Sequence, residues 1–417
     1  MSSVSSGVAM DQDLVALRAH ARAGRAADAE QVARDLLARD PDCVEALRLL
    51  AGAAFARSDA ATAIALLSRA ANAEPHNPGI PLELGLAYRA AERFDAARYV
   101  LERAVELGRG DPTPRLLLAN VLELDQRRDV ALLHYFRAII EARQAGRWNG
   151  DADTDPSLRE LVAHARRFAI DGRRAMLLRS FEERRAAEPQ ARWDRVEAAL
   201  AIYLGERAAA PADPRQQPGF MFVPGIETGP FIAAGRFAWA VADGVAPLLA
   251  LGEEPGACLA AATPRADGIA TAPLLVRGVA RASLRRAAPR LHAALAALPL
   301  ARVLNHGPDS ELISLAAGAR ARGKTGGANS RCRIVVNLVD SAPLVVDVAG
   351  ESRALDPGRH LAIDPCFAHA YACAGPGVAR LLWFDVSHPD LATGEQQAIA
   401  DLIERAVDFE TRVMDLP

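Results

Sequence analysis

A spacing of 34 residues recurs through the first third of the sequence. At this offset Ala29, Ala63, Ala97 and Ala131 align, as do Leu50, Leu84 and Leu118, and Ala70, Ala104 and Ala138. Small and apolar residues at this period predict pairs of antiparallel helices, because small side chains let two helices approach closely. Pro41 and Pro75, also one period apart, would end one pair before the next begins.

A single helix pair leaves its apolar face exposed, so such units must stack, and the stack forms a concave groove. The fullest copy of the pattern is Leu84-Gly85-x-x-Tyr88, followed by Ala97, Leu101 and Ala104. This pattern resembles the tetratricopeptide repeat (TPR) family, and the resemblance covers about four units over residues 12–145. It implies a groove that binds a protein or peptide; a spacer or a dimerisation arm is the alternative.

Composition narrows the class of partner and the compartment. A net charge of −3 and a pI near 6.3 give no basic field for nucleic acid or anionic lipid. The five cysteines are scattered without a CxxC pair, which argues against a disulfide framework and a zinc cluster. The first ten residues do not resemble a signal peptide, and no apolar run is long enough for a membrane span. We therefore expect a cytoplasmic protein.

Residues 146–215 are predicted to be a helical connector and linker. Turn-forming residues fill 146–156, and apolar periodicity predicts helices over 158–188 and 193–203. Residues 208–218 are rich in Ala and Pro, so we place the domain boundary there. The Arg pairs at 166–167, 173–174 and 184–185 indicate a solvated helix face or, alternatively, a surface for an acidic partner.

Residues 216–417 are predicted to form a sheet-rich domain. Helices are expected near 235–251 and 280–297. From residue 310, short β-rich runs alternate with Gly, Pro and Asp: 311–315, 332–338, 344–348, 360–363, 369–373 and 378–386. Strands of this length separated by turn residues favour a sandwich or jelly roll.

Several motifs in this half occur in an order that resembles the aspartyl/asparaginyl β-hydroxylase family. They are Phe222-Val-Pro-Gly225, Thr325-Gly326, Asn329-x-Arg331-x-Arg333, Asp364-x-x-x-x-His369 and His388-Pro389. The resemblance implies a double-stranded β-helix (jelly-roll, cupin-like) domain over residues 216–417. It also implies iron(II), 2-oxoglutarate and hydroxylation of an Asp or Asn side chain in a peptide or protein.

The family's site residues carry over only in part. His369 matches the second metal histidine, Arg380 the arginine that holds the oxoacid, and Arg333 an arginine of the same pocket. Ile313 stands where the family has a serine, although Ser314 is adjacent. Lys324 stands where the first metal histidine is expected.

Lysine is a poor replacement for imidazole, because its ammonium has no lone pair until it loses a proton. With His369 as the one protein ligand, the sequence predicts loss of the iron site. Three alternatives would preserve it: a histidine from His306, His360 or His388, a buried and deprotonated Lys324, or a shifted alignment.

Two functions remain open on the sequence. One is an iron(II)/2-oxoglutarate hydroxylase whose repeats present the substrate. The other is a catalytically inactive relative that recruits a protein through its repeats and binds an acidic small molecule among Lys324, Arg333 and Arg380.

His369, Arg380 and two nearby cysteines also have purely structural interpretations. His369 could be a core histidine, and Arg380 could pair with Asp364 or Asp385. Cys366 and Cys373 could bind a soft metal, although small buried hydrophobes are the commoner role for cysteine.

Overall fold

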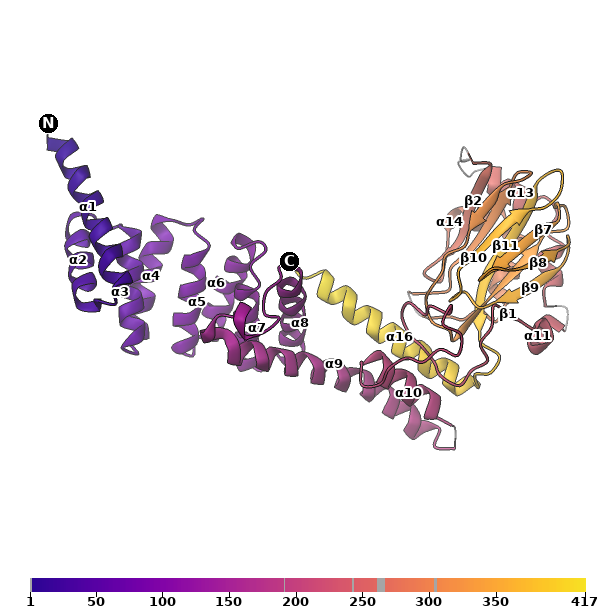
Figure 1. The fold of residues 1–417 in the computed structure, drawn as a ribbon, viewed down its shortest axis with the longest axis horizontal. Helices are drawn as coiled ribbons and strands as arrows, with labels where there is room; N and C mark the ends of the chain where they lie inside the picture. Colours follow the sequence, from indigo (N-terminus) through magenta and orange to yellow (C-terminus); the bar gives the residue numbers. More distant parts are fainter. Residues whose placement is uncertain (1, 191, 242–243, 261–266, 304–305) are drawn as a thin grey trace. The chain divides into compact units, whose positions relative to one another are not determined.

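The computed structural model describes residues 2–190, 192–241, 244–260, 267–303 and 306–417 (Figure 1). The chain divides into two compact units, Met1–Ala175 with Phe409–Pro417, and Met176–Asp408. We call them the repeat unit and the sheet unit. The division falls inside helix α9 (Arg159–Ala187), so the predicted connector 146–215 does not form a unit of its own.

The repeat unit is built from consecutive helix pairs, which Figure 1 shows side by side. The pairs are α1 (Ser2–Arg22) with α2 (Ala26–Arg39), α3 (Val44–Ala56) with α4 (Ala60–Ala73), α5 (Gly79–Ala90) with α6 (Phe94–Leu107), and α7 (Thr113–Leu124) with α8 (Arg128–Gln144). Two short 3-10 helices, η1 (Asp151–Asp153) and η2 (Pro156–Leu158), then lead into α9. The predicted helical solenoid is confirmed.

The 34-residue period reflects helix contacts. The aligned Ala29, Ala63, Ala97 and Ala131 are at most 2% exposed. A Cβ added at Gly85 would lie 2.5 Å from Leu101 Cγ, so glycine is what lets α5 and α6 pack this closely. The turns inside the pairs repeat as well: Gly24, Ser58, Glu92 and Gln126 all have positive φ, between 56° and 69°.

The sheet unit contains two antiparallel sheets. The larger has the order β1-β9-β6-β11-β4-β2-β3 and the smaller the order β5-β10-β7-β8. The larger sheet comprises β1 (Phe231–Ile232), β2 (Ile269–Val276), β3 (Val279–Ala280), β4 (Ser310–Leu315), β6 (Arg331–Asn337), β9 (His360–Ile363) and β11 (Ala379–Ser387). The smaller comprises β5 (Arg320–Arg322), β7 (Leu344–Val348), β8 (Glu351–Leu355) and β10 (His369–Cys373).

The strand order is that of a double-stranded β-helix. From β4 onward the chain alternates between the sheets, apart from the β7–β8 hairpin, and so gives β9-β6-β11-β4 facing β5-β10-β7-β8. The predicted jelly-roll domain is therefore confirmed. The predicted strands at 344–348, 360–363 and 369–373 coincide with β7, β9 and β10.

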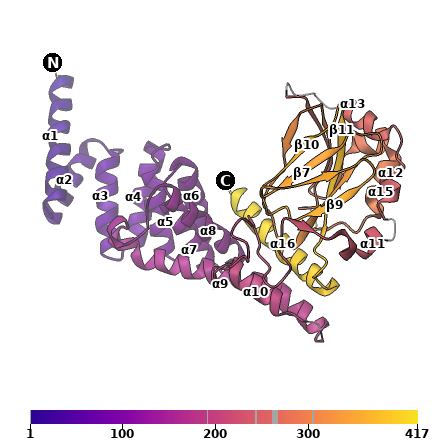
Figure 2. The ribbon, with the colours of Figure 1, turned by 45° about the vertical axis from the view of Figure 1, so that its right-hand side comes forward.

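Two cores cover the two faces of the larger sheet. The inter-sheet core contains Val335, Tyr371 and Leu381, together with apolar residues of β4, β7 and β9. The outer core packs Leu312, Leu382 and Phe384 against short helices. These helices are α11 (Ala238–Val241), α12 (Ala246–Leu249), α14 (Ala282–Ala287) and α15 (Pro289–Ala297), with α13 (Glu254–Ala260) contacting α14 and β2. Figure 2 shows α12 and α15 on one side of the larger sheet, and β7 and β10 of the smaller sheet on its other side.

The sequence patterns missed several elements. Strands β2 and β8 and the long helix α16 (Thr393–Met414) were not predicted. The helix expected over 235–251 is instead the 3-10 helix η3 (Ala234–Arg236) with α11 and α12, and residues 242–243 of that range lie outside the described residues. A third core joins the end of α9, α10 (Asp194–Tyr203) and α16 within the sheet unit.

Candidate functional site

The His369 imidazole is buried at the start of β10, and both of its nitrogens have close neighbours. Its Nδ1 lies 2.8 Å from the Phe367 carbonyl, which can only accept, so Nδ1 carries the proton. Burial lowers the pKa of His369 to about 4, and the neighbouring Arg333 charge acts in the same direction. The ring is therefore neutral at pH 7, and Nε2 has the lone pair that a metal would need.

That lone pair faces the Arg333 guanidinium. Arg333, on β6, places Nη1 3.3 Å from His369 Nε2 and 3.1 Å from the Lys324 carbonyl oxygen. Its Nε and Nη2 donate to the two carboxylate oxygens of Asp385 at 2.9 and 3.2 Å, and its guanidinium lies 3.8 Å from the centre of the Trp383 ring. Burial opposes the charge of Arg333, but Asp385 more than compensates and raises the pKa of Arg333.

Backbone closes the remaining approach to Nε2. A Cβ added at Gly323 would lie 2.0 Å from His369 Nε2 and 2.1 Å from Cδ2, so the glycine backbone rests against this edge of the ring. The Gly323 amide also donates to the His369 carbonyl at 2.9 Å. Gly323 and Arg333 together cover the nitrogen at which an iron ion would bind.

Lys324 does not enter the site. Its side chain is 73% exposed, and Nζ lies 3.9 Å from Asp309 Oδ2. Its contribution to the His369 cluster is the backbone carbonyl that Arg333 binds. The Lys324 side chain therefore does not join Arg333 in one pocket, as the sequence had predicted. It is also not buried, as one of the alternatives required.

Arg380 and Ser314 lie on the opposite face of the larger sheet from Arg333. They are cross-strand partners of β11 and β4. Side chains alternate along a strand, so Arg380 shares its face with Leu382 and Phe384 of the outer core. Arg380 donates to the Asp340 carbonyl at 2.6 Å and lines a cavity of about 220 Å³ beside α12 and α13.

The inter-sheet positions nearest Arg380 and Ser314 are apolar. They are Ile313, Leu315, Ala379 and Leu381, all buried in the inter-sheet core. Arg380 and Ser314 therefore do not share one acid-binding pocket with Arg333, as the resemblance had implied, because strand alternation places them on opposite faces of the sheet. Asp385, considered from the sequence as a partner for Arg380, pairs with Arg333 instead.

The other candidate ligands do not reach His369. His306 Nε2 lies 2.9 Å from Asp408, and His388 Nδ1 accepts from the Asp390 amide at 3.2 Å. His360 is the partner of Val336, an outer-core residue, and so lies on the outer face. Across the described parts of the chain, no three His, Cys, Asp or Glu side chains come together in a group that could hold a metal. Cys366 and Cys373 are buried free thiols.

Sequence reasoning missed Gly323 and Trp383 as parts of this cluster. The signal for Trp383 was available in principle, because Trp383 and Asp385 are two residues apart and so share a face of β11. The contact of Gly323 depends on how β5 and the start of β10 pack, which no local pattern gives.

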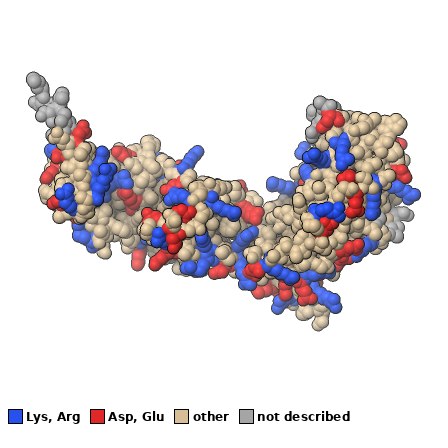
Figure 3. Space-filling view, in the orientation of Figure 1, with Lys and Arg blue, Asp and Glu red and all other residues tan. Residues whose placement is uncertain are grey.

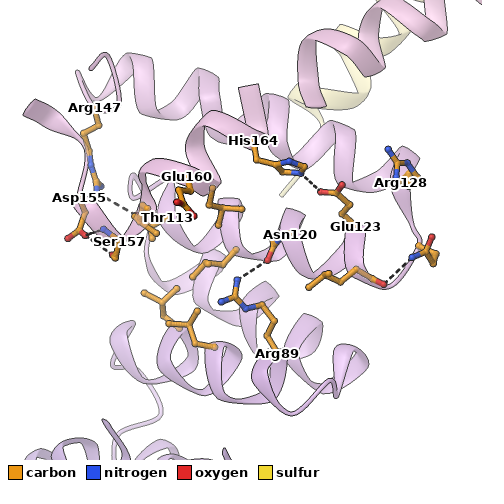
Figure 4. A pocket seen from close by; sticks show the side chains of 17 residues that line it. Arg89, Thr113, Asn120, Glu123, Arg128, Arg147, Asp155, Ser157, Glu160 and His164 are labelled. Carbon is orange, nitrogen blue, oxygen red and sulfur yellow. Dashed lines mark hydrogen bonds and ion pairs between the residues drawn. The ribbon is translucent and has the colours of Figure 1, made fainter. Parts of the chain in front are cut away.

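The repeat unit has its own cavity, of about 980 Å³, on the faces of α5, α7 and the first turns of α9 (Figure 4). Its apolar lining is Leu82, Leu86, Leu117, Leu124, Leu158 and Leu161. Its polar lining includes Arg89, Asn120, Glu123, Arg128, Arg147, Glu160 and His164. We call this cavity the repeat groove; an apolar lining with polar groups at its edge suits a peptide with both kinds of side chain.

Comparisons with known proteins agree with the repeat prediction. Residues 54–121 match the family model described as Tetratricopeptide repeat. Among solved structures, one titled "Crystal structure of MamA" matches 33% of this chain and 80% of its own at 20% identity and a TM-score of 0.32. A thermophilic TPR protein from Thermus thermophilus matches 36% of this chain and 77% of its own, at 24% identity and a TM-score of 0.29.

The sheet unit has a solved neighbour with a cupin name. The Cupin_2 domain of an XRE family transcriptional regulator from Enterobacter cloacae matches 28% of this chain and 96% of its own, at 18% identity and a TM-score of 0.20. No curated protein matches the sequence. The double-stranded β-helix assignment rests on the strand order given above.

Charged side chains of both signs lie on the surface of the repeat unit. On the face shown in Figure 3, acidic and basic side chains are interspersed along the repeat unit. Of the helices described here, none is both long and apolar enough to cross a membrane.

Proposed function

We propose that this protein is a non-catalytic recruiter, in which the repeat groove binds a segment of a partner protein and the β-helix domain performs no iron chemistry. The absence of iron chemistry is inferred from the Arg333 guanidinium, which binds Asp385 and lies against Nε2 of His369. A permanently charged donor at this nitrogen takes the position of a metal cation.

The fit between these residues and iron is poor. Iron(II) needs several fixed ligands with open positions. Here the imidazole nitrogen faces Arg333, the Asp385 carboxylate is paired with the same guanidinium, and Lys324 points away. A hydroxylase would require Arg333 to leave a position in which it is 5% exposed and paired with Asp385. These residues therefore do not fit an iron site.

The second sequence hypothesis, an acidic ligand inside the barrel, also loses support. It required three cations in one pocket, but Asp385 neutralises Arg333, and Arg380 and Lys324 lie elsewhere. What remains of that hypothesis is the recruitment of a protein through the repeats, which the match over residues 54–121 supports.

An activity assay tests the proposal that the β-helix domain performs no iron chemistry. We expect purified protein with iron(II), 2-oxoglutarate and oxygen to form no succinate above a protein-free blank. We also expect calorimetry with iron(II) under anaerobic conditions to show no saturable heat. Iron-dependent succinate formation would overturn the proposal.

Site-specific photo-crosslinking tests the proposal that the repeat groove binds a partner protein. A photoreactive residue at Leu86, in the repeat groove, should give discrete cross-linked products in the native cell. The matched control is Tyr99 on α6, which is 74% exposed and outside the groove. Equal products at both positions would contradict a groove-specific partner.

A further inference from the structure

Charged pairs join successive first helices of the repeats. Arg18 on α1 binds Glu45 on α3 through two hydrogen bonds of 2.8 and 2.7 Å. Arg48 on α3 binds Glu83 on α5, with its shortest contact at 2.5 Å. At both junctions a carboxylate of this chain neutralises the guanidinium.

The junction between α5 and α7 breaks this pattern. Arg89, on α5, donates from Nη1 to the neutral amide oxygen of Asn120 on α7 at 2.8 Å (Figure 4). Within the described residues Arg89 has no carboxylate partner, although it is partly buried. A guanidinium has five N–H donors in a fork, so most of this donor capacity is left for another acceptor.

Nearby groups do not neutralise Arg89. Glu123 Oε2 lies 2.7 Å from His164 Nε2 and accepts from the Tyr135 hydroxyl at 2.9 Å, and among the described residues Glu123 forms no ion pair with Arg89. Arg128 lies over the Phe168 ring at 5.0 Å and, like Arg89, has no carboxylate partner among the described residues.

The remaining charges of the groove lie around α9 and the segment before it. Arg147 is paired with Asp111 at 2.7 Å, and Asp155 accepts from the Ser157 amide and hydroxyl. Glu160, on the first turn of α9, is exposed. The charged side chains that line the groove are therefore of both signs, and Arg89 is the guanidinium on α5 whose remaining N–H donors meet no carboxylate among the described residues.

We propose that the α5–α7 junction binds an acidic side chain of the partner, with Arg89 holding its carboxylate and Leu82, Leu86 and Leu117 holding an adjacent large apolar side chain. The partner segment is thus a peptide in which Asp or Glu neighbours a residue such as Leu or Phe. A carboxylate is the group that a guanidinium fork fits best, and the leucines supply the apolar contact area. This inference rests on the proposed function and specifies the partner's chemistry.

A peptide array tests the proposal with the full-length protein. The probe is a set of immobilised short random peptides, on which the wild-type protein should select sequences that place Asp or Glu next to a large apolar residue. Arg89→Met should lose the acidic preference and bind those peptides about tenfold more weakly, since one charge-assisted contact is removed. Arg89→Lys should retain part of the preference. Arg103→Met, which removes an exposed partner of Glu106 on α6, is the matched control and should bind as the wild type does.

The outcomes separate this inference from the proposed function. If the wild type and Arg89→Met select the same peptides, and Leu86→Glu abolishes the selection, the groove binds peptides but Arg89 is not the acid site, and this inference is overturned alone. If Leu86→Glu has no effect, or no peptide binds, both the inference and groove-based recruitment are overturned. Circular dichroism melting of each variant verifies that the repeats remain folded.

Discussion

Nη1 of Arg333 lies 3.3 Å from Nε2 of His369 in the interior of the β-helix. The contact uses a guanidinium that is already bound to both carboxylate oxygens of Asp385. An imidazole that elsewhere in such folds could serve as a metal ligand is here a neutral acceptor in a charged internal network.

Arg333→Met should destabilise the sheet unit by about 3–5 kcal/mol, because it leaves the buried Asp385 carboxylate without its partner. Urea unfolding followed by tryptophan fluorescence measures this loss, since Trp383 lies directly against Arg333. Arg380→Met is the control, and we expect a change within about 0.5 kcal/mol. Adding Asp385→Leu to Arg333→Met should recover much of the loss; no recovery would mean that packing rather than charge is at stake.

Gly323→Ala should destabilise the sheet unit by about 1–3 kcal/mol, since the new Cβ would collide with the His369 ring. Combining it with His369→Ala should remove this additional cost. Gly256→Ala in α13 is the control, because a Cβ there meets nothing within 4 Å, and it should be neutral or stabilising. Thermal melting compares the variants, and an unchanged melting temperature in Gly323→Ala would show that the ring can move aside.

The stability of the sheet unit should fall on acidification from about pH 6.5 to pH 4. The pKa of His369 is lowered to about 4 in the folded protein by burial, from an ordinary value of 6.5, and that of His388 likewise. Between these values the unfolded chain binds protons that the folded chain does not, so stability rises with pH. Each histidine contributes a slope of about 1.4 kcal/mol per pH unit.

Substitution of one of these histidines measures its share of the slope. His369→Gln should remove about half of the combined dependence, whereas exposed His76→Gln should leave it unchanged. Urea midpoints measured between pH 4 and pH 7 provide the data. An identical slope in wild type and His369→Gln would show that folding does not lower the pKa of His369.

Lys324→His should not create an iron site, because position 324 points toward Asp309 and Nε2 of His369 remains in contact with Arg333. Anaerobic titration with iron(II) should give the same result for the variant and the wild type. Saturable binding by Lys324→His alone would show that Arg333 leaves His369 readily and would restore the hydroxylase hypothesis.

The repeat unit could be predicted closely because its information is local. The period that aligns Ala63, Ala97 and Ala131 is also the period of the helix contacts, so a one-dimensional pattern reports three-dimensional packing. Short strands with turn residues between them predicted a sandwich or jelly roll, and the family resemblance narrowed this to a double-stranded β-helix. The bounds of β7, β9 and β10 were predicted to the residue.

Within the candidate site, the sequence could identify residue types but not their directions. It identified His369, Arg333, Arg380 and Lys324, and it identified Lys324 as a departure from the metal-binding pattern. The side on which each lies depends on strand alternation, where a shift of one residue exchanges the two faces of a sheet, so Arg380 lies in the outer layer and Ala379 in the inter-sheet core. The pairing of Arg333 with Asp385 and His369 joins β6 to β10 and β11, and the paired residues lie 36 and 52 positions further along the chain. Only the tertiary structure decides such a contact, because no local pattern specifies which strands become neighbours.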